Sequence, residues 1–419
     1  MITKKFILNV AAIICFNGVV FGQNNNDPFS IIGIGSIDHS SYDRTSGMGH
    51  AGMALSSNRF LYNANAASLS ALDDKFFNVE MAATTKFIGY SGTPINSSSS
   101  SSSDLQFKKI SLAIKVKPKW GIGFGLLPYS NTSYSFYGDK YILGSSSITS
   151  AYYQGSGHVS QLYLSNGYKL TKNLSLGLQA SYLFGQLNQS ENIAPGYGID
   201  SAIITTRKIN VGAPYFKPSF QYNLRVNKNL ELLVGGTATF KKQLVAKYSL
   251  SVTDGNTTLP EYTDYKGQDI TLPAQYSGSI AAKLKDKYTF AIDYSYQNWS
   301  DLKQQGINYR TVDSRFIGAG FELSKKQNFR DITFERHFFQ AGVFYNDSYL
   351  QINGQQISSY GLTFGGGKNL LRSNLGVQLN MELGIHGTTN YGLIQERYAQ
   401  INVILSYRDF WFVKVKKFD

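Results

Sequence analysis

The chain has 419 residues and a formal net charge of +13, from 40 Lys and Arg against 27 Asp and Glu. The cations are scattered through short turns and form no basic helix or long run, so nucleic acid is excluded as a predicted partner. The single cysteine, Cys15, excludes a disulfide framework, and the fold must be held by packing and backbone hydrogen bonds.

Residues 1–22 have the pattern of a secretory signal peptide. Lys4 and Lys5 precede an apolar run that extends to Phe21, and Gly22 stands before a polar stretch. The run is short and is interrupted by asparagines, which disfavours the alternative of an uncleaved anchor. We therefore expect cleavage near Gly22 and export of the remaining chain.

Residues 23–73 show no strand-like alternation and are rich in Gly, Ala and Ser, with a weak helical tendency around Ala64 to Leu72. The segment is too apolar to extend freely into water and too irregular to span a membrane. Irregular backbone is tolerated at membrane depth only where protein surrounds it. We predict an N-terminal hatch, or plug, inside a barrel formed by the rest of the chain; a periplasmic tail is the alternative.

Residues 74–412 alternate apolar and polar side chains in runs of about 9 to 14 residues, the length of a tilted strand that crosses a bilayer. In "NLSLGLQASYLF" (173–184) the Leu, Tyr and Phe side chains occupy one face, and Ser, Gly and Gln occupy the other. "SNLGVQLNMELGI" and "KYTFAIDYSYQNW" repeat the pattern. We expect the apolar face to contact lipid and the polar face to line the lumen.

The connections fall into two kinds that alternate along the chain. Short Lys- and Asn-rich turns are predicted near 117–119, 171–173, 227–229, 285–287, 324–331 and 368–373. Longer polar stretches lie at about 91–104, 138–157, 190–213, 249–273, 300–311, 347–358 and 386–396. This order predicts an all-β fold, a 14-stranded antiparallel transmembrane β-barrel of the outer membrane with short periplasmic turns and a basic periplasmic tail at 413–419. A soluble sandwich or propeller is the alternative.

Three tryptophans stand near predicted strand ends, at Trp120, Trp299 and Trp411. Aromatic residues gather at both membrane–water interfaces of such barrels. We therefore expect all three in an interface girdle.

The sequence lacks the constellations that carry catalysis. Its five histidines are dispersed with no metal-ligand spacing, and no glycine loop has the spacing that cradles phosphate. His158 and Ser160, two residues apart on one strand, have no evident orienting partner for nucleophilic chemistry. We predict no enzyme activity, no metal site and no cofactor.

Two motifs in the segment before the barrel resemble a known family. "GMGHAGMAL" followed by "NANAASLSAL" is similar to the glycine-rich hatch and Asn-Pro-Ala signature of the FadL family of outer-membrane proteins. The stretch "LPAQYSGSIAAKLKDKYTFAIDYSYQNWSDL" resembles that family's downstream strand pair, with Asp293 and Trp299. The resemblance implies a 14-stranded barrel with an N-terminal plug, and Ala66 stands where the family usually has proline. The residues that it assigns to the hatch are Gly47, Gly49, Gly52, Ala54, Asn65, Ala67 and Leu69.

Two functions follow as expectations. The first is passage of hydrophobic small molecules, such as long-chain fatty acids, with a ligand bound by the apolar hatch residues Phe29, Ile31, Ile32, Met48 and Met53. The second is a non-enzymatic barrel subunit of a larger outer-membrane complex, either barrel-assembly machinery or a type IX secretion accessory. The sequence resembles outer-membrane proteins of Bacteroidota, in which FadL-like barrels also serve as such accessories. Outer-membrane lipid is the expected surrounding partner in both cases.

Overall fold

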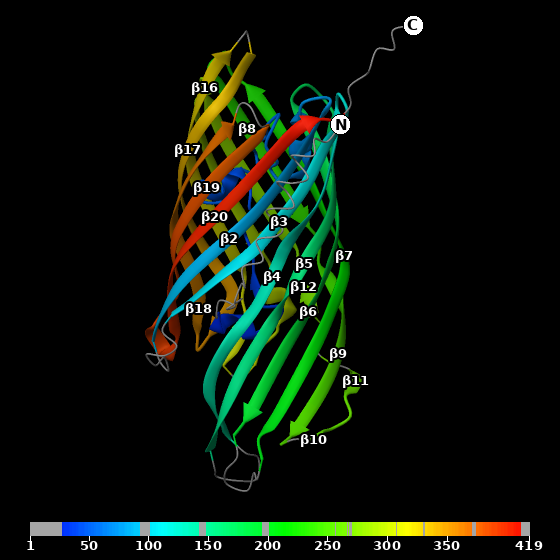
Figure 1. Ribbon diagram of the computed structural model, residues 1–419, viewed down its shortest axis with the longest axis vertical. Coiled ribbons are helices and arrows are strands. Elements are labelled where there is room, and N and C mark those ends of the chain that lie inside the picture. The colour runs from blue at the N-terminus through cyan, green and yellow to red at the C-terminus, as the bar shows by residue number, and fades with distance from the viewer. Residues whose placement is uncertain are drawn as a thin grey trace, which may run out of the picture.

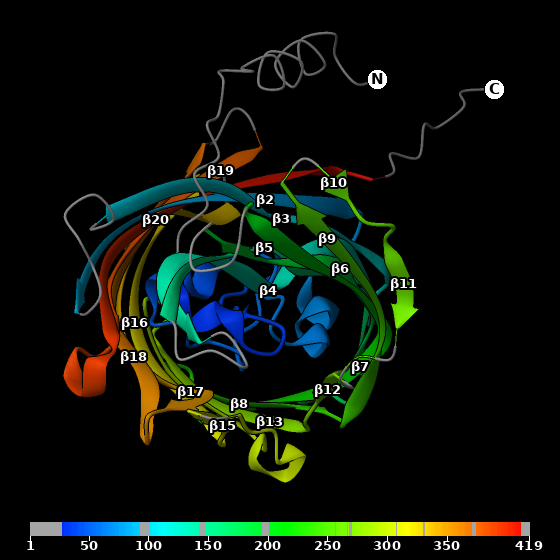
Figure 2. The same cartoon turned by 90° about the horizontal axis from the view of Figure 1, so that it is seen from below.

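The computed structural model describes residues 27–411 except 93–100, 142–147, 195–200, 256, 266, 268–269, 307, 330–331 and 371–373. In these residues the chain forms a closed antiparallel barrel around an N-terminal segment (Figures 1 and 2). The predicted signal peptide (1–22) and basic tail (413–419) lie outside the described residues.

The wall has 14 strands, as predicted. Two of them are each divided into two consecutive segments: β8 continues as β9, and β12 continues as β13, with Thr239 of β8 opposite Gln275 and Leu244 of β9 opposite Ile270. Strand β2 pairs with β20 along its whole length, which closes the barrel. In chain order the wall consists of β2 (Phe76–Gly92), β3 (Ser101–Lys117), β4 (Trp120–Tyr141), β5 (Ile148–Lys169), β6 (Leu174–Ile193), β7 (Ile203–Arg225), β8 (Leu230–Thr239), β9 (Lys242–Asp254), β12 (Ile270–Leu272), β13 (Gln275–Leu284), β14 (Tyr288–Gln297), β16 (Ser314–Phe329), β17 (Ile332–Ile352), β18 (Gln355–Leu370), β19 (Leu375–Gly387) and β20 (Ile394–Phe410).

The predicted alternation is confirmed by the exposure of side chains along the strands. On β6, Leu178 is 46% exposed on the outer face, whereas Gln179 is 1% exposed on the inner face. The strand therefore presents apolar atoms to lipid and amides or hydroxyls to the interior, where the plug supplies hydrogen-bond partners. None of the helical segments among the described residues is long and apolar enough to cross a membrane.

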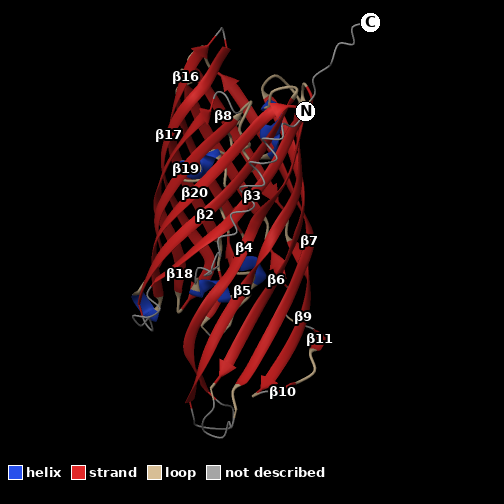
Figure 3. Ribbon diagram, viewed as in Figure 1, coloured by secondary structure: helices blue, strands red, loops and turns tan. Residues whose placement is uncertain are grey.

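Strands β4 to β7 extend farther than the sequence predicts. The stretches 138–157 and 190–213 were predicted to be long outer loops, but most of their described residues belong to β4, β5, β6 and β7. These strands project beyond the rest of the wall at the end opposite to the one where β20 ends (Figure 3). A strand with water on both faces can be polar throughout and still pair with its neighbours. The polar composition of these stretches therefore did not show where the strands end. Likewise, the short turn predicted at 324–331 is the end of the long β16–β17 hairpin.

The N-terminal segment lies inside the barrel (Figure 2). Its regular elements are short, because glycines and small side chains favour turns over long helices. They are the 3₁₀ helices η1 (Pro28–Ile31), η2 (Arg44–Gly47) and η3 (Ala66–Ala71) and the strand β1 (Ser36–Ile37). Helix η3 contacts β3 to β7. On the long-loop side, the connections contain β10 (Thr257–Thr258), β11 (Tyr262–Tyr265), η5 (Ser300–Leu302), β15 (Tyr309–Thr311) and η6 (Asn390–Gly392).

Candidate functional site: the plugged lumen

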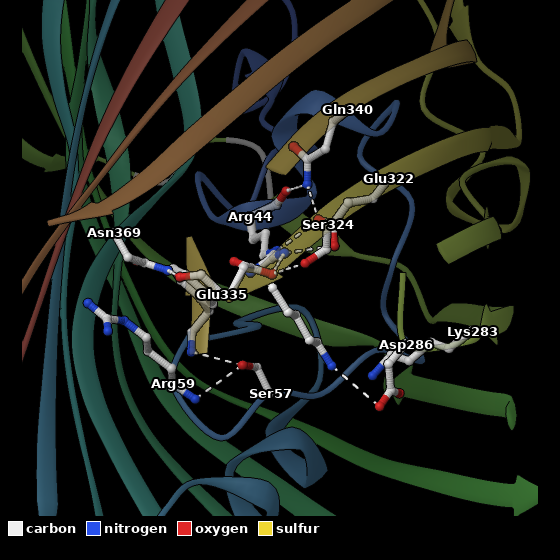
Figure 4. Close-up of polar contacts among 12 residues, drawn as sticks. Arg44, Ser57, Arg59, Lys283, Asp286, Glu322, Ser324, Glu335, Gln340 and Asn369 are labelled. Carbon is white, nitrogen blue, oxygen red and sulfur yellow. Dashed lines mark hydrogen bonds and ion pairs between the residues drawn. The ribbon is translucent and has the colours of Figure 1, made fainter. Parts of the chain in front are cut away.

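Arg44 of η2 fastens the plug to the wall strands β16 and β17 (Figure 4). Its Nε and Nη2 donate to the two carboxylate oxygens of Glu322 at 2.8 and 2.7 Å, and its Nη1 and Nη2 donate to those of Glu335 at 2.8 and 2.6 Å. The side chain is 5% exposed, and its guanidinium carbon lies 4.0 Å from the centre of the Phe338 ring. Gln340 Nε2 donates to the Arg44 carbonyl at 2.8 Å. A buried cation satisfied by two carboxylates holds this turn in one position.

Wall carboxylates also accept hydrogen bonds from the irregular backbone of the plug. Glu80 accepts from Lys109 Nζ at 2.7 Å and from the backbone N–H of Leu61 at 2.9 Å. Asp293 accepts from the backbone N–H of Met53 at 2.9 Å. Buried backbone donors without a secondary-structure partner need such acceptors. Asp293, which the family resemblance singled out, thus lies on wall strand β14 and points its carboxylate at the plug backbone.

The hatch glycines allow the plug backbone to touch the wall. Gly49 has φ +62°, and its N–H donates to Thr363 Oγ1 at 2.7 Å. A Cβ at Gly49 would lie 2.2 Å from the Val343 carbonyl oxygen. On the wall, a Cβ at Gly342 would lie 2.1 Å from the Gly49 nitrogen. Glycine faces glycine here, so a side chain on either one would force the backbones apart. The other assigned positions, Gly47, Gly52 and Ala54, lie in the same part of the plug, and all three are buried.

Asn65 organises the second motif. Its Oδ1 accepts from the N–H of Ala67 at 3.0 Å, which caps η3, and its Nδ2 donates to the carbonyls of Met53 and Phe220 at 3.2 and 2.9 Å. One side chain thus joins the helix start, the hatch and strand β7. Ala67 and Leu69 are buried in η3, and Ala66 is its first residue.

The five predicted ligand residues pack within the plug and against the wall. Phe29 meets the ring of His386 edge-on at 5.2 Å, Met48 and Met53 are buried, and Ile31 and Ile32 are half-buried. None of the five lines the polar cavity of the lumen. Whether they bind a ligand stays a prediction.

That cavity has a volume of about 240 Å³ and lies toward the long-loop end of the barrel. Its lining combines aromatic, aliphatic and neutral polar residues with nine charged or imidazole side chains: Asp27, Asp38, His39, His50, Lys86, Lys108, Glu382, His386 and Glu396. His50 Nε2 and Glu382 Oε2 lie 2.9 Å apart, and Tyr398 donates to the other Glu382 oxygen at 2.8 Å. Within the described ranges, no group of three or more His, Cys, Asp and Glu is arranged to hold a metal ion. This lining suits water or a polar solute.

The two plug histidines of this cavity differ in charge state. Burial lowers the pKa of His39 to about 4, so its ring is neutral near neutral pH. Burial also acts to lower the pKa of His50, but the neighbouring Glu382 carboxylate outweighs that effect and raises it above 6.5. The sequence did not reveal this group, because His39, His50 and Glu382 are far apart along the chain and only the closed barrel brings them together.

Strands β3 and β4 separate partway along the wall. Their pairing ends at Ile110 opposite Leu126, although both strands continue toward the long-loop end. Beyond this point β4 pairs with the plug strand β1 instead, with Ser130 opposite Ile37. Pro128 lacks an N–H, and a bulge follows it, which favours a bend at this position.

A second cavity of about 360 Å³ lies at this separation. It is lined by Phe107, Leu126, Leu127 and Pro128 among others, and it shares Gln106, Lys108 and Asn131 with the lumen cavity. The gap in the ladder therefore adjoins the interior of the barrel.

The tryptophans are placed differently from one another. Trp120 begins β4 beside a short turn, and Trp411 is 61% exposed directly after β20. Trp299, however, is 3% exposed and stacks on Tyr349 with ring centres 4.2 Å apart. Its assignment to an interface girdle is wrong, because the chain turns inward after β14 and buries the ring in an apolar cluster.

Solved structures of outer-membrane channels resemble this barrel. A FadL homologue from Pseudomonas aeruginosa matches with a TM-score of 0.58 and 13% identity over 91% of this chain and 100% of that one. The toluene transporter TbuX of Ralstonia pickettii matches with a TM-score of 0.53 and 16% identity over 88% and 97%. TodX of Pseudomonas putida, also a toluene transporter, matches with 0.52 and 15% over 91% and 100%. The chain has the FadL-like fold, and it lies in the cell outer membrane.

Comparison with curated protein sequences found no match. A family model described as BamG matches residues 1–419. Since that match spans the full sequence, the chain belongs to the BamG family.

Proposed function

We propose that this protein is a plugged, non-enzymatic barrel subunit of an outer-membrane barrel-assembly complex. A barrel-assembly subunit is one of the two functions expected from the sequence, and the family model described as BamG covers the whole chain. The structural observation that carries the proposal is the buried link from Arg44 to Glu322 and Glu335.

That link disfavours a plug that opens and closes. Removing Arg44 from its partners would leave two carboxylates uncompensated in the barrel interior, and breaking a buried pair typically costs about 3–5 kcal/mol. The backbone hydrogen bonds to Glu80 and Asp293 would have to break with it. A fixed plug favours a structural role over repeated transport cycles.

The test is affinity purification of the full chain from native outer membranes in mild detergent. We expect a barrel-assembly component to be recovered in stoichiometric amount. Recovery of a secretion component instead would place the subunit in a secretion complex, and a lone barrel that carries lipid would contradict the complex altogether. An unrelated tagged barrel of similar abundance, purified in parallel, is the control for nonspecific recovery.

A second candidate function is passage of hydrophobic small molecules, among them long-chain fatty acids. The separation of β3 and β4 favours it, because the cavity there, with Phe107, Leu126 and Pro128 in its lining, adjoins the lumen cavity. Three similar solved structures are a FadL homologue and two toluene transporters.

Uptake into proteoliposomes tests this candidate, with labelled oleate and toluene as probes and empty liposomes as the control. We expect uptake to depend on the protein and to fall in Pro128→Trp, which fills the cavity at the strand separation. Uptake equal to that of empty liposomes would contradict the passage function. Protein-dependent uptake that is unchanged in Pro128→Trp would exclude this route.

A further inference from the structure

The outer face of the barrel carries a groove that neither proposed function uses. It has a volume of about 930 Å³ and is lined by residues of β18, β19, β20, β2 and β3. Figure 1 shows where these strands lie in the wall. Phe87, Leu362 and Leu383 form its walls, and all three are exposed on the lipid side. The small residues Gly89 and Ala399 leave the space between these large side chains empty. A Cβ added at Gly89 would have only the Arg397 carbonyl oxygen within 4 Å, at 3.9 Å.

An arginine stands at the long-loop end of this groove. Arg397 is exposed on the outer face, directly opposite Gly89 on β2 and Ile385 on β19. Among the described residues no carboxylate lies within ion-pair distance of it, and its Nε donates a 3.4 Å hydrogen bond to Gln395 Oε1. An unneutralised cation on the lipid face is costly near the bilayer centre and tolerable near the interface.

Tyrosines place Arg397 at that interface. Ile385 pairs with Tyr360, and Tyr360 pairs with Tyr345, and both tyrosine rings are exposed outward. Tyrosine is enriched at the level of the headgroups. The end of β20 and the short turns lie at the opposite end, which is the periplasmic end in this class of barrel, so the arginine faces the outer leaflet.

We propose that this groove binds a phosphate-bearing acyl lipid of the outer leaflet. The phosphate pairs with the Arg397 guanidinium, which matches phosphate geometry and finds no other anion nearby. An acyl chain lies over Gly89 and Ala399, between Phe87 and Leu383. A neighbouring barrel offers a convex wall that would close over a groove without filling it, whereas a flexible chain fills it.

Binding of defined lipids to the full-length protein tests the proposal. Dimyristoyl phosphatidic acid and dimyristoyl glycerol, which has the same acyl chains without the phosphate, are titrated separately, and native mass spectrometry counts the lipids retained. We expect the phosphatidic acid to bind at least about tenfold more tightly, since a charge-assisted pair to phosphate is worth that much. Equal retention of the two lipids by the wild-type protein would overturn the proposal.

Three variants separate the contributions. Arg397→Gln is expected to remove the preference for phosphatidic acid, and Gly89→Leu to weaken both lipids about tenfold by filling the groove. Gly278→Leu is the matched control, because Gly278 also faces outward on β13 and has no heavy atom within 4 Å of an added Cβ. Heat-modifiable gel mobility verifies that each variant is folded. Unchanged binding in both groove variants would overturn the proposal, as would a photo-crosslinker at position 89 that captures a protein instead of lipid.

Discussion

The two ends of the lumen hold the plug in different ways. Toward the short turns, Arg44, the hatch glycines and η3 are fixed by buried ion pairs, backbone hydrogen bonds and contacts without intervening side chains. Toward the long loops, a polar cavity separates parts of the plug from the wall, and β3 and β4 part beside it. The same barrel therefore combines a plug that is fixed to the wall at the periplasmic end with a solute-sized cavity at the outer end.

The largest effect on the free energy of unfolding is expected from removing the ion pairs of Arg44 at the short-turn end of the lumen. Arg44→Ala should lower the free energy of unfolding by about 3–5 kcal/mol, because Glu322 and Glu335 lose their buried cation. Urea unfolding in detergent, followed by tryptophan fluorescence, measures it. Lys326→Ala is the control, since the exposed pair of Lys326 with Asp286 should contribute less than about 1 kcal/mol. Equal effects of the two variants would contradict a plug pinned at Arg44.

A side chain placed between η3 and the wall should have the next largest effect. In Gly177→Leu the new Cβ would lie 2.3 Å from the Ala67 nitrogen, so the helix must shift, at a cost of about 1–3 kcal/mol. Thermal unfolding of this variant is compared with that of Gly278→Leu, in which the added side chain faces outward into free space. A shift no larger than in the control would show that η3 is loosely held.

The outer end is predicted to respond to pH through His50. Its pKa is raised in the folded protein, so its stabilising contribution is complete below its ordinary value of 6.5 and is lost as pH rises through the raised value. We expect His50→Gln to lose less stability than the wild type between about pH 6 and pH 9. His39 stays neutral in the folded state over this window, since its pKa is about 4. Identical pH profiles of unfolding would contradict a charged His50–Glu382 pair.

The smallest effect is expected at the start of η3. Proline fits the first position of a helix and restricts the unfolded chain, so Ala66→Pro should raise the free energy of unfolding by up to about 1 kcal/mol. Differential scanning calorimetry measures the change. A loss of stability would show that Ala66 has replaced proline for a packing reason.

Sequence patterns predicted the wall well because lipid and lumen impose a strict two-residue period, as on β6 and β19. They missed the projecting parts of β4 to β7, where both faces are polar, and the inward turn that buries Trp299. In the lumen, the resemblance of two short motifs to a known family singled out the hatch glycines and Asn65, which contact the wall or cap η3. The Arg44 and His50 partners were not, because barrel closure, and not proximity in sequence, sets those contacts.

Hydrogen–deuterium exchange of residues 43–72 in the intact protein most directly tests whether the plug is a fixed closure. We expect the backbone amides of Gly49, Met53 and Leu61 to exchange as slowly as those of the paired wall strands, because each donates to a buried wall side chain. Exchange of these amides as fast as in the exposed connections would contradict it.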